Sequence, residues 1–267
     1  MSETIGQPGD MALPRPLGVG EILRTALQLY RRHWRTLLAI AAVVVVPLTI
    51  LQYLFGDLVR TQGESTRDGV VETATWSVGI AGLVAALAGI LMYLVLTGAI
   101  TRAVAAEVAG QDPSVEQSYR FGFHRLGSVL LVSVLVGLAI IGGLILFIIP
   151  GIYIGIRLCV SIEALVVEGR RGTEAMGRSW GLVGGHWWHA FGAIVVGGLL
   201  TGIVNAVITA PFGDTSWFVQ AVAAAVATVV TLPYSALVGV LLYLDLRARK
   251  ENLTMETLRT DLQASAA

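Results

Sequence analysis

The chain has 267 residues, of which 55% are hydrophobic and only 13% are charged. That composition, with a mean hydropathy of +0.75, excludes an ordinary soluble globular domain and indicates an integral membrane protein. The 18 basic and 18 acidic residues cancel, so only their positions are informative, and a lone cysteine, Cys159, excludes an internal disulfide.

The N-terminal residues lack the pattern of a secretory signal peptide. Glu3 and Asp10 place acidic groups where such a signal carries basic ones, and the first long apolar run begins only at Leu37. We expect residues 1–14 to form a disordered cytoplasmic arm and residues 15–247 to form the membrane domain. Residues 248–267 are expected to be a cytoplasmic C-terminal tail.

Six apolar segments approach the roughly 20 residues that a helix needs to cross a hydrocarbon core about 30 Å thick. They are residues 37–55, 77–100, 127–149, 151–167, 190–210 and 218–244. The third and fourth form one apolar run, which Pro150 and Gly151 are expected to break into a hairpin. Gly151 and Gly155 form a small-xxx-small pair, typical of close helix contact. The sequence predicts an all-α, polytopic membrane bundle of six transmembrane helices.

The basic residues predict the orientation of this bundle. Of the 18 Lys and Arg, 15 lie before the first span, in the second and fourth connections or after the last span, and the exceptions are Arg60, Arg67 and Arg157. Basic flanks resist translocation, so these regions and both termini should be cytoplasmic. Trp187 and Trp188 support the same orientation, because tryptophan is enriched at membrane boundaries.

A pattern in residues 21–40 recurs in residues 174–193. In the overlay, four residues match in type, namely Glu21, Leu29, His33 and Trp34 with Glu174, Leu182, His186 and Trp187. Both copies space their apolar residues along one helical face. A weaker third copy begins at Asp112 and Pro113, which are typical of a helix start. Either the chain is three units, each an amphipathic interfacial helix followed by two spans, or the overlay is a chance match.

The interfacial helices are expected to lie on the cytoplasmic face with their apolar sides in the lipid boundary. Each basic residue near the surface adds about 1 kcal/mol of attraction to acidic lipid. The predicted contacts with anionic headgroups are Arg24, Arg31, Arg32, Arg35, Arg171 and Arg178. Membrane lipids are therefore the expected partners, with a membrane protein as a possible further one and no nucleic acid.

Motifs for catalysis are lacking. The sequence contains no phosphate-binding loop, H-E-x-x-H, C-x-x-C or G-x-S-x-G motif. His186 and His189 have a spacing that metal ligands use, but no carboxylate or cysteine accompanies them locally. We predict no catalytic residue, no metal site and no cofactor.

Two ionisable residues of the fourth apolar segment are ligand-binding candidates. Arg157 is expected near mid-depth and Glu163 near the cytoplasmic end, about 240° apart on a helix, so they cannot pair along one face. An arginine in the membrane centre costs about 2.5–3.5 kcal/mol and normally faces the bundle interior. Asn205, in the fifth segment, is a candidate partner. A structural polar tie and a role in conduction or substrate binding both remain open.

Three stretches of the chain resemble a bacterial six-span membrane family. They are RPLGVGEILRTALQLYRRHWRTLL, IIPGIYIGIRLCVSIEALVVEGRRGTEAMGRSWGLVGGHWW and LLYLDLRARKEN. The family is named after the membrane domain of glycerophosphoryl diester phosphodiesterases and includes stand-alone membrane proteins; the resemblance covers residues 15–252. Its most specific pieces are a P-G-I-Y-x-x-x-R hairpin and a Y-x-D-L-R-x-R exit, here Tyr243, Asp245, Leu246, Arg247 and Arg249.

The resemblance implies a bacterial plasma membrane protein with six spans. In the namesake proteins a separate soluble domain performs the hydrolysis, and no such domain is expected here. The family supplies no established catalytic residue to carry over to this chain.

These features favour a non-enzymatic bacterial inner-membrane protein that serves as a scaffold, an assembly partner or an envelope-homeostasis factor. The alternative is a small transporter or lipid-handling protein in which Arg157 binds an anionic headgroup or solute inside the bundle. An enzyme acting at the lipid surface is a third hypothesis.

Overall fold

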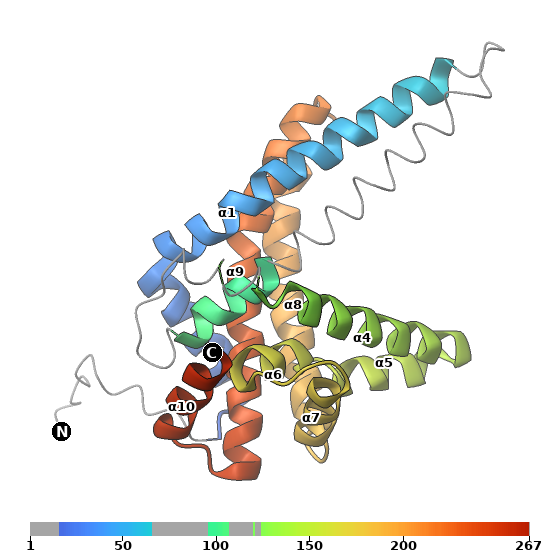
Figure 1. Cartoon of the computed structure of the whole chain (residues 1–267). Coiled ribbons are helices and arrows are strands. Elements are labelled where there is room, and N and C mark those ends of the chain that lie inside the picture. Colours follow the sequence, from blue (N-terminus) through green and yellow to red (C-terminus); the bar gives the residue numbers. More distant parts are fainter. Residues whose placement is uncertain (1–15, 66–95, 107–119, 121–123, 267) are drawn as a thin grey trace.

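The computed structural model describes residues 16–65, 96–106, 120 and 124–266, and all regular structure within these ranges is helical (Figure 1). Its α-helices are α1 (Val19–Ser65), α4 (Leu126–Leu146), α5 (Ile148–Arg157), α6 (Ser161–Glu168), α7 (Thr173–Val183), α8 (Trp187–Thr209), α9 (Trp217–Glu251) and α10 (Met255–Ala266). A shorter apolar helix covers Leu96–Ala106, and a 3₁₀ turn covers Ala210–Phe212. The predicted all-α class is confirmed for this part of the chain.

Five helical segments of the described part are long and apolar enough to cross a membrane. They are Val19–Ile50, Leu126–Leu146, Ile148–Glu168, Trp187–Phe212 and Trp217–Glu251. The described part therefore has the helices of a multi-span membrane protein. The second predicted segment, residues 77–100, lies mostly outside the described residues, so the sixth span stays a prediction. The N-terminal arm and the start of the third repeat copy lie outside them as well.

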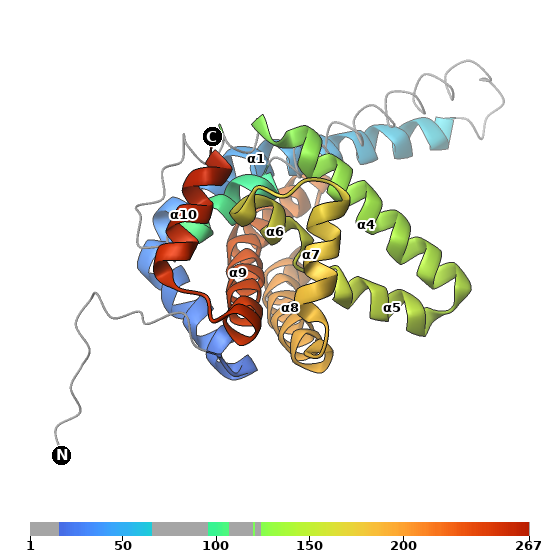
Figure 2. The same ribbon diagram turned by 60° about the horizontal axis from the view of Figure 1, so that its bottom comes forward.

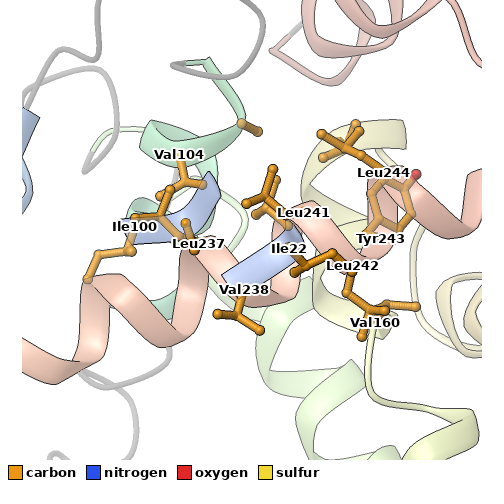
Figure 3. Close-up of a cluster of buried hydrophobic side chains, with 14 of the residues drawn as sticks. Ile22, Ile100, Val104, Val160, Leu237, Val238, Leu241, Leu242, Tyr243 and Leu244 are labelled. Carbon is orange, nitrogen blue, oxygen red and sulfur yellow. The ribbon is translucent and has the colours of Figure 1, made fainter. Parts of the chain in front are cut away.

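The core of the bundle forms where the C-terminal half of α9 meets α1, the Leu96–Ala106 helix and the connection between α5 and α6. Figure 3 shows these contacts at one cluster, contributed by Ile22, Ile100, Val104, Val160, Leu237, Val238, Leu241, Leu242, Tyr243 and Leu244. The opposite end of α9 is more open, since Val222 is 43% and Val226 49% exposed. The bundle is thus packed most tightly at the end where α9 finishes.

Helices α4 and α5 form an arm that points away from α8 and α9 (Figures 1 and 2). The chain turns at Phe147, whose backbone is extended, and α5 begins at Ile148. Pro150 lies in the first turn of α5, where its missing N–H breaks no helical hydrogen bond. The break therefore falls just before the expected one at Pro150 and Gly151.

Two glycines allow α4 and α5 to approach closely. A Cβ atom on Gly143 would lie 2.9 Å from the Cα of Gly151, and one on Gly151 would lie 2.8 Å from the backbone nitrogen of Leu144. Gly155 has more room, because a Cβ there would meet Ile140 at 3.7 Å, an ordinary contact distance. The tight contact of the hairpin is therefore between Gly151 and Gly143, a residue that the sequence analysis did not single out.

The predicted interfacial helices differ in how they join the apolar helices that follow. Helix α7 is separate from α8, and the chain turns between them through Gly184, Gly185 and His186. In contrast, the two helical stretches of α1 meet directly at a kink at His33, whose backbone is not helical. The first interfacial helix is therefore the stretch of α1 that precedes this kink.

The C-terminal residues fold back onto the bundle. Helix α9 ends at Asn252, which has a left-handed backbone with φ of 49°, and α10 follows. Leu258 and Leu262 of α10 are buried, with only 1% and 0% of their surface exposed. The expected tail, residues 248–267, thus contains the last turn of α9 and a packed amphipathic helix.

Candidate functional site

Four polar residues near the end of α9 point to two sides of that helix. Tyr243 and Arg247 are one turn apart and approach α6, whereas Asp245 and Arg249, also one turn apart, contact Leu17 before α1. Residues two apart on a helix are separated by about 200°, so alternate positions of the Y-x-D-L-R-x-R segment serve opposite sides. This segment is where α9 is tied to the rest of the bundle.

On the first side, Glu168 at the end of α6 is the shared acceptor. It accepts hydrogen bonds from the Tyr243 hydroxyl, from Arg178 Nε at 2.7 Å and from Arg170 Nε at 2.6 Å. Its side chain is only 7% exposed, and Arg247 Nε lies 3.5 Å from it. One carboxylate therefore joins α6, α7 and α9.

Arg178 bridges two carboxylates. Besides its bonds to Glu168, Arg178 donates to both carboxylate oxygens of Glu251. Its Nη1 atom donates to Oε1, and its Nη2 atom donates to Oε2 at 2.6 Å. Partial burial lowers the pKa of Arg178, but the hydrogen bonds to Glu251 and Glu168 outweigh this effect and raise the pKa above its ordinary value. Arg178 was expected to contact lipid headgroups; the structure commits its guanidinium to α6 and α9.

The same network holds α10 against the bundle. Arg247 Nη1 donates to Asp261 Oδ2 at 2.7 Å, and Arg102 Nη2 donates to the backbone oxygen of Leu262 at 2.9 Å. These contacts reach α10 from α9 and from the Leu96–Ala106 helix respectively. They fix α10 in position above the buried side chains of Leu258 and Leu262.

On the second side of α9, Asp245 and Arg249 clamp the backbone of Leu17. The Leu17 N–H donates to Asp245 Oδ1 at 2.6 Å, and Arg249 Nη2 donates to the Leu17 carbonyl at 2.6 Å. Asp245 Oδ2 also accepts from Arg249 Nε at 2.9 Å, and His189 Nε2 lies 2.9 Å from the same oxygen. The side chain of Asp245 is fully buried. The start of α1 and the end of α9 therefore lie at the same end of the bundle.

The fourth apolar segment is a broken helix. Helix α5 ends at Arg157 and α6 begins at Ser161, so three residues between them leave the helical path. The buried hydroxyl of Ser179 in α7 donates to the Arg157 carbonyl at 2.9 Å and accepts from the Val160 N–H at 3.3 Å. Ser179 thereby supplies hydrogen bonds to backbone groups that the break would leave unpaired.

The break changes the position of Arg157. On a straight helix Arg157 was expected near mid-depth of the membrane, and that depth stays a prediction; the structure places its side chain beside the junction of α7 and α8. Its guanidinium carbon lies 4.3 Å from the ring centre of Trp180 and 5.7 Å from that of Tyr153. Tyr153 in turn stacks on Trp187, with ring centres 5.8 Å apart. Arg157 is thus surrounded by aromatic residues at the start of α8.

The three expected ligand-binding residues do not form one site. Glu163 is buried in α6 with Oε1 against Gly239, where a Cβ atom would lie only 2.5 Å away. Its Oε2 has no hydrogen-bond partner among the described residues. Asn205 lies about five turns along α8 from Trp187, and within the described ranges no ion pair or hydrogen bond joins it, Glu163 and Arg157.

The arginines of α1 are among the predicted contacts with lipid headgroups. Four of the side chains are exposed, namely Arg24, Arg31, Arg32 and Arg35. Arg35 lies over the ring of Trp34, at 5.4 Å from its centre, and Trp34 is 47% exposed. Arg171, between α6 and α7, is exposed as well. Their contact with anionic headgroups stays a prediction.

Chemical groups for metal binding do not gather in the part of the chain that the structure describes. No cluster of three or more His, Cys, Asp or Glu side chains suited to a metal ion occurs there.

Comparison with models of known protein families, with curated proteins and with solved structures gives no match.

Neither Glu168, the shared acceptor, nor Ser179, which supports the break between α5 and α6, was predicted from the sequence. Glu168 lies just past the fourth apolar segment, and its partners Arg170, Arg178 and Tyr243 lie two, ten and 75 residues along the chain. The one sequence signal that pointed here was the alternation of Tyr243, Asp245 and Arg247 at the end of α9.

Proposed function

We propose that the chain is a non-enzymatic membrane protein of the bacterial plasma membrane that serves as a scaffold, an assembly partner or an envelope-homeostasis factor. The observation that carries the proposal is how the charged groups are used. Around Glu168, Arg178 and Arg247, and around Asp245, acidic and basic side chains pair with one another across helices. Groups so paired hold elements together and leave little unpaired charge for chemistry on a substrate.

The shape of the bundle supports a binding role. The arm of α4 and α5 exposes apolar side chains along its length, with Leu138 61% and Ile149 80% exposed. Lipid tails are as apolar as these side chains, so hydrophobicity alone does not drive the arm to bind another helix. In a membrane, small residues and complementary shape decide which helices associate. The arm therefore offers another membrane protein a surface that leaves the bundle core undisturbed.

We further propose that both termini are cytoplasmic. The contact between Leu17 and Arg249 places the start of α1 and the end of α9 at one end of the bundle. Ends on the same side of a membrane require an even number of crossings, which the six predicted spans supply. The concentration of basic residues in the flanks of the spans favours the cytoplasm for that side. The family resemblance to stand-alone six-span membrane proteins agrees with this proposal.

Site-specific photo-crosslinking in intact cells tests the binding role. A crosslinker at Leu138 or Ile149 is expected to give a discrete adduct with one membrane protein. The matched control is Val207 on α8, which is 68% exposed but lies outside the arm. Adducts with lipid only at both arm positions, or the same protein adducts from Val207, would contradict the proposal.

A further inference from the structure

Arg157 differs from the other arginines at this end of the bundle because it has no acidic partner. Arg170, Arg178, Arg247 and Arg249 each lie within 2.9 Å of a carboxylate oxygen. For Arg157 no such ion pair exists in the described ranges, and its buried Nε atom has no hydrogen-bond acceptor. The side chain is partly buried, and a charge withdrawn from water without a counter-ion carries a cost, so Arg157 is placed to receive an anion.

The aromatic rings hold the guanidinium by its face, its Nε atom is buried, and no hydrogen bond within the described residues uses its Nη1 and Nη2 donors. Trp180 and Tyr153 stabilise the positive charge through their ring faces, and their planes meet at 84°. The N–H donors of a guanidinium lie in its plane and point outward from its edge. Gly184 also contributes, because a Cβ atom there would lie 2.8 Å from Nη1. Any larger residue at position 184 would displace the guanidinium.

The start of α8 adds backbone donors next to this arginine. Tyr153 is stacked on Trp187, the first residue of α8, and no side chain caps that helix end. The first N–H groups of a helix have no partner within the helix and carry partial positive charge, which favours an anion. Arg157 and the N-terminus of α8 thus present positive charge to the same region.

The location of Arg157 indicates which kind of anion it would meet. Tyr153 is 43%, Trp180 39% and Trp188 76% exposed, and the apolar span Trp187–Phe212 begins here. Such a collection of partly exposed aromatic rings is typical of the headgroup level of a bilayer. Phosphate is the anionic group of lipid headgroups, and arginine pairs with it through two parallel hydrogen bonds.

We propose that Arg157, held between Trp180 and Tyr153 beside the start of α8, binds a phosphate group at the membrane boundary. The phosphate comes from a lipid headgroup or from free phosphate in solution. This inference goes beyond the scaffold role, because a scaffold needs no phosphate site, and it differs from a solute site deep inside the bundle.

Native mass spectrometry of the purified full chain in detergent tests the site. The probes are dioleoyl phosphatidylglycerol, dioleoylglycerol with the same acyl chains but no phosphate, and inorganic phosphate. Wild-type protein is expected to retain phosphatidylglycerol over dioleoylglycerol, and Arg157→Ala to lose roughly tenfold in affinity for it, the worth of one charge-assisted pair. Displacement of the lipid by inorganic phosphate identifies free phosphate as the source, whereas its retention identifies the headgroup; both results support a phosphate site.

A pair of glycine variants keeps the test decisive if Arg157→Ala fails to fold. Gly184→Ala retains the charge but crowds Nη1, whereas Gly181→Ala meets no atom within 4 Å. Gly184→Ala is expected to reduce phosphatidylglycerol binding and Gly181→Ala to leave it unchanged. Equal binding of phosphatidylglycerol and dioleoylglycerol by wild type, or unchanged binding by Gly184→Ala, would overturn the proposal.

Discussion

His33 and His186 have the same non-helical backbone conformation, although they lie far apart in the chain. Their φ and ψ angles are −120° and 29° for His33 and −123° and 27° for His186. Each residue marks the point where an amphipathic helical stretch meets an apolar helix. These are the two histidines that the overlay of residues 21–40 on residues 174–193 placed in register.

Burial around the two histidines follows the same register. Five pairs of equivalent positions are each at most 1% exposed, namely Ile22 and Ala175, Ala26 and Ser179, Leu29 and Leu182, Leu37 and Ala190, and Ile40 and Ala193. A chance match between two amphipathic helices would not bury equivalent positions both before and after His33 and His186. The structure therefore favours an internal repeat of these two units.

Removal of the Glu168 carboxylate should loosen the network at the end of α9. Glu168→Gln takes away the charge that Arg178 and Arg170 share, and we expect a loss of about 2–3 kcal/mol in the free energy of unfolding. Thermal unfolding of the purified protein in detergent measures it as a lower Tm. Glu174→Gln, at an exposed position in the first turn of α7, is the matched control. An equal Tm for the two variants would show that the network adds little stability.

The hydroxyl of Ser179 should be needed to stabilise the break between α5 and α6. Ser179→Ala leaves the buried N–H of Val160 without its partner, at an expected cost of about 1–3 kcal/mol. Ser235→Ala removes a hydroxyl that is exposed on α9, and its effect should be small. Denaturant titration monitored by tryptophan fluorescence compares the two variants. The account of the break fails if Ser179→Ala is as stable as Ser235→Ala.

The α4–α5 hairpin should tolerate alanine at one glycine and resist it at another. A methyl group at Gly151 overlaps Leu144, so Gly151→Ala should cost about 1–3 kcal/mol through forced separation of the two helices. Gly142→Ala meets no atom within 4 Å and should be neutral. Limited proteolysis within the hairpin, followed by mass spectrometry, should show faster cleavage in Gly151→Ala only. Equal cleavage rates would contradict the close approach at Gly143.

Loss of Asp245 should release the segment that precedes α1. Asp245→Ala removes the acceptor of the Leu17 N–H and the partner of Arg249. The loss of one buried hydrogen bond costs about 1–3 kcal/mol. The rate of amide hydrogen exchange at the first residues of α1 should therefore rise by roughly tenfold or more. Asp214→Ala, at an exposed position before α9, serves as the control. Unchanged exchange at residues 17–20 in Asp245→Ala would mean that other contacts hold this segment.

The elements that follow from hydropathy were predictable, and those that depend on distant partners were not. Five of the apolar segments reappear as helices because lipid requires about 20 consecutive apolar residues for each crossing. The turn at Phe147 was missed because neither proline nor glycine occurs there, while Pro150 fits into the first turn of α5. The break at residues 158–160 was missed because the segment was treated as one straight helix.

The candidate site shows the same division. The spacing of Tyr243, Asp245 and Arg247 was visible in the sequence, but their partners lie on α6, α10 and the residues before α1. No local pattern indicates that Glu168 collects hydrogen bonds from α7, from α9 and from Arg170 in the connection after α6. Contacts of this kind depend on how the helices pack, which hydropathy does not report.

The central claim is a multi-span membrane protein whose two termini both lie in the cytoplasm. Fusions of green fluorescent protein and of alkaline phosphatase to the C-terminus, expressed in bacterial cells, test it most directly, with the same pair of reporters at the N-terminus as a second readout. The account predicts fluorescent cells and inactive phosphatase for both ends of the chain. An active phosphatase fused after Ala267, with no fluorescence from the matching fusion, would contradict the orientation and, together with a cytoplasmic N-terminus, the even number of spans.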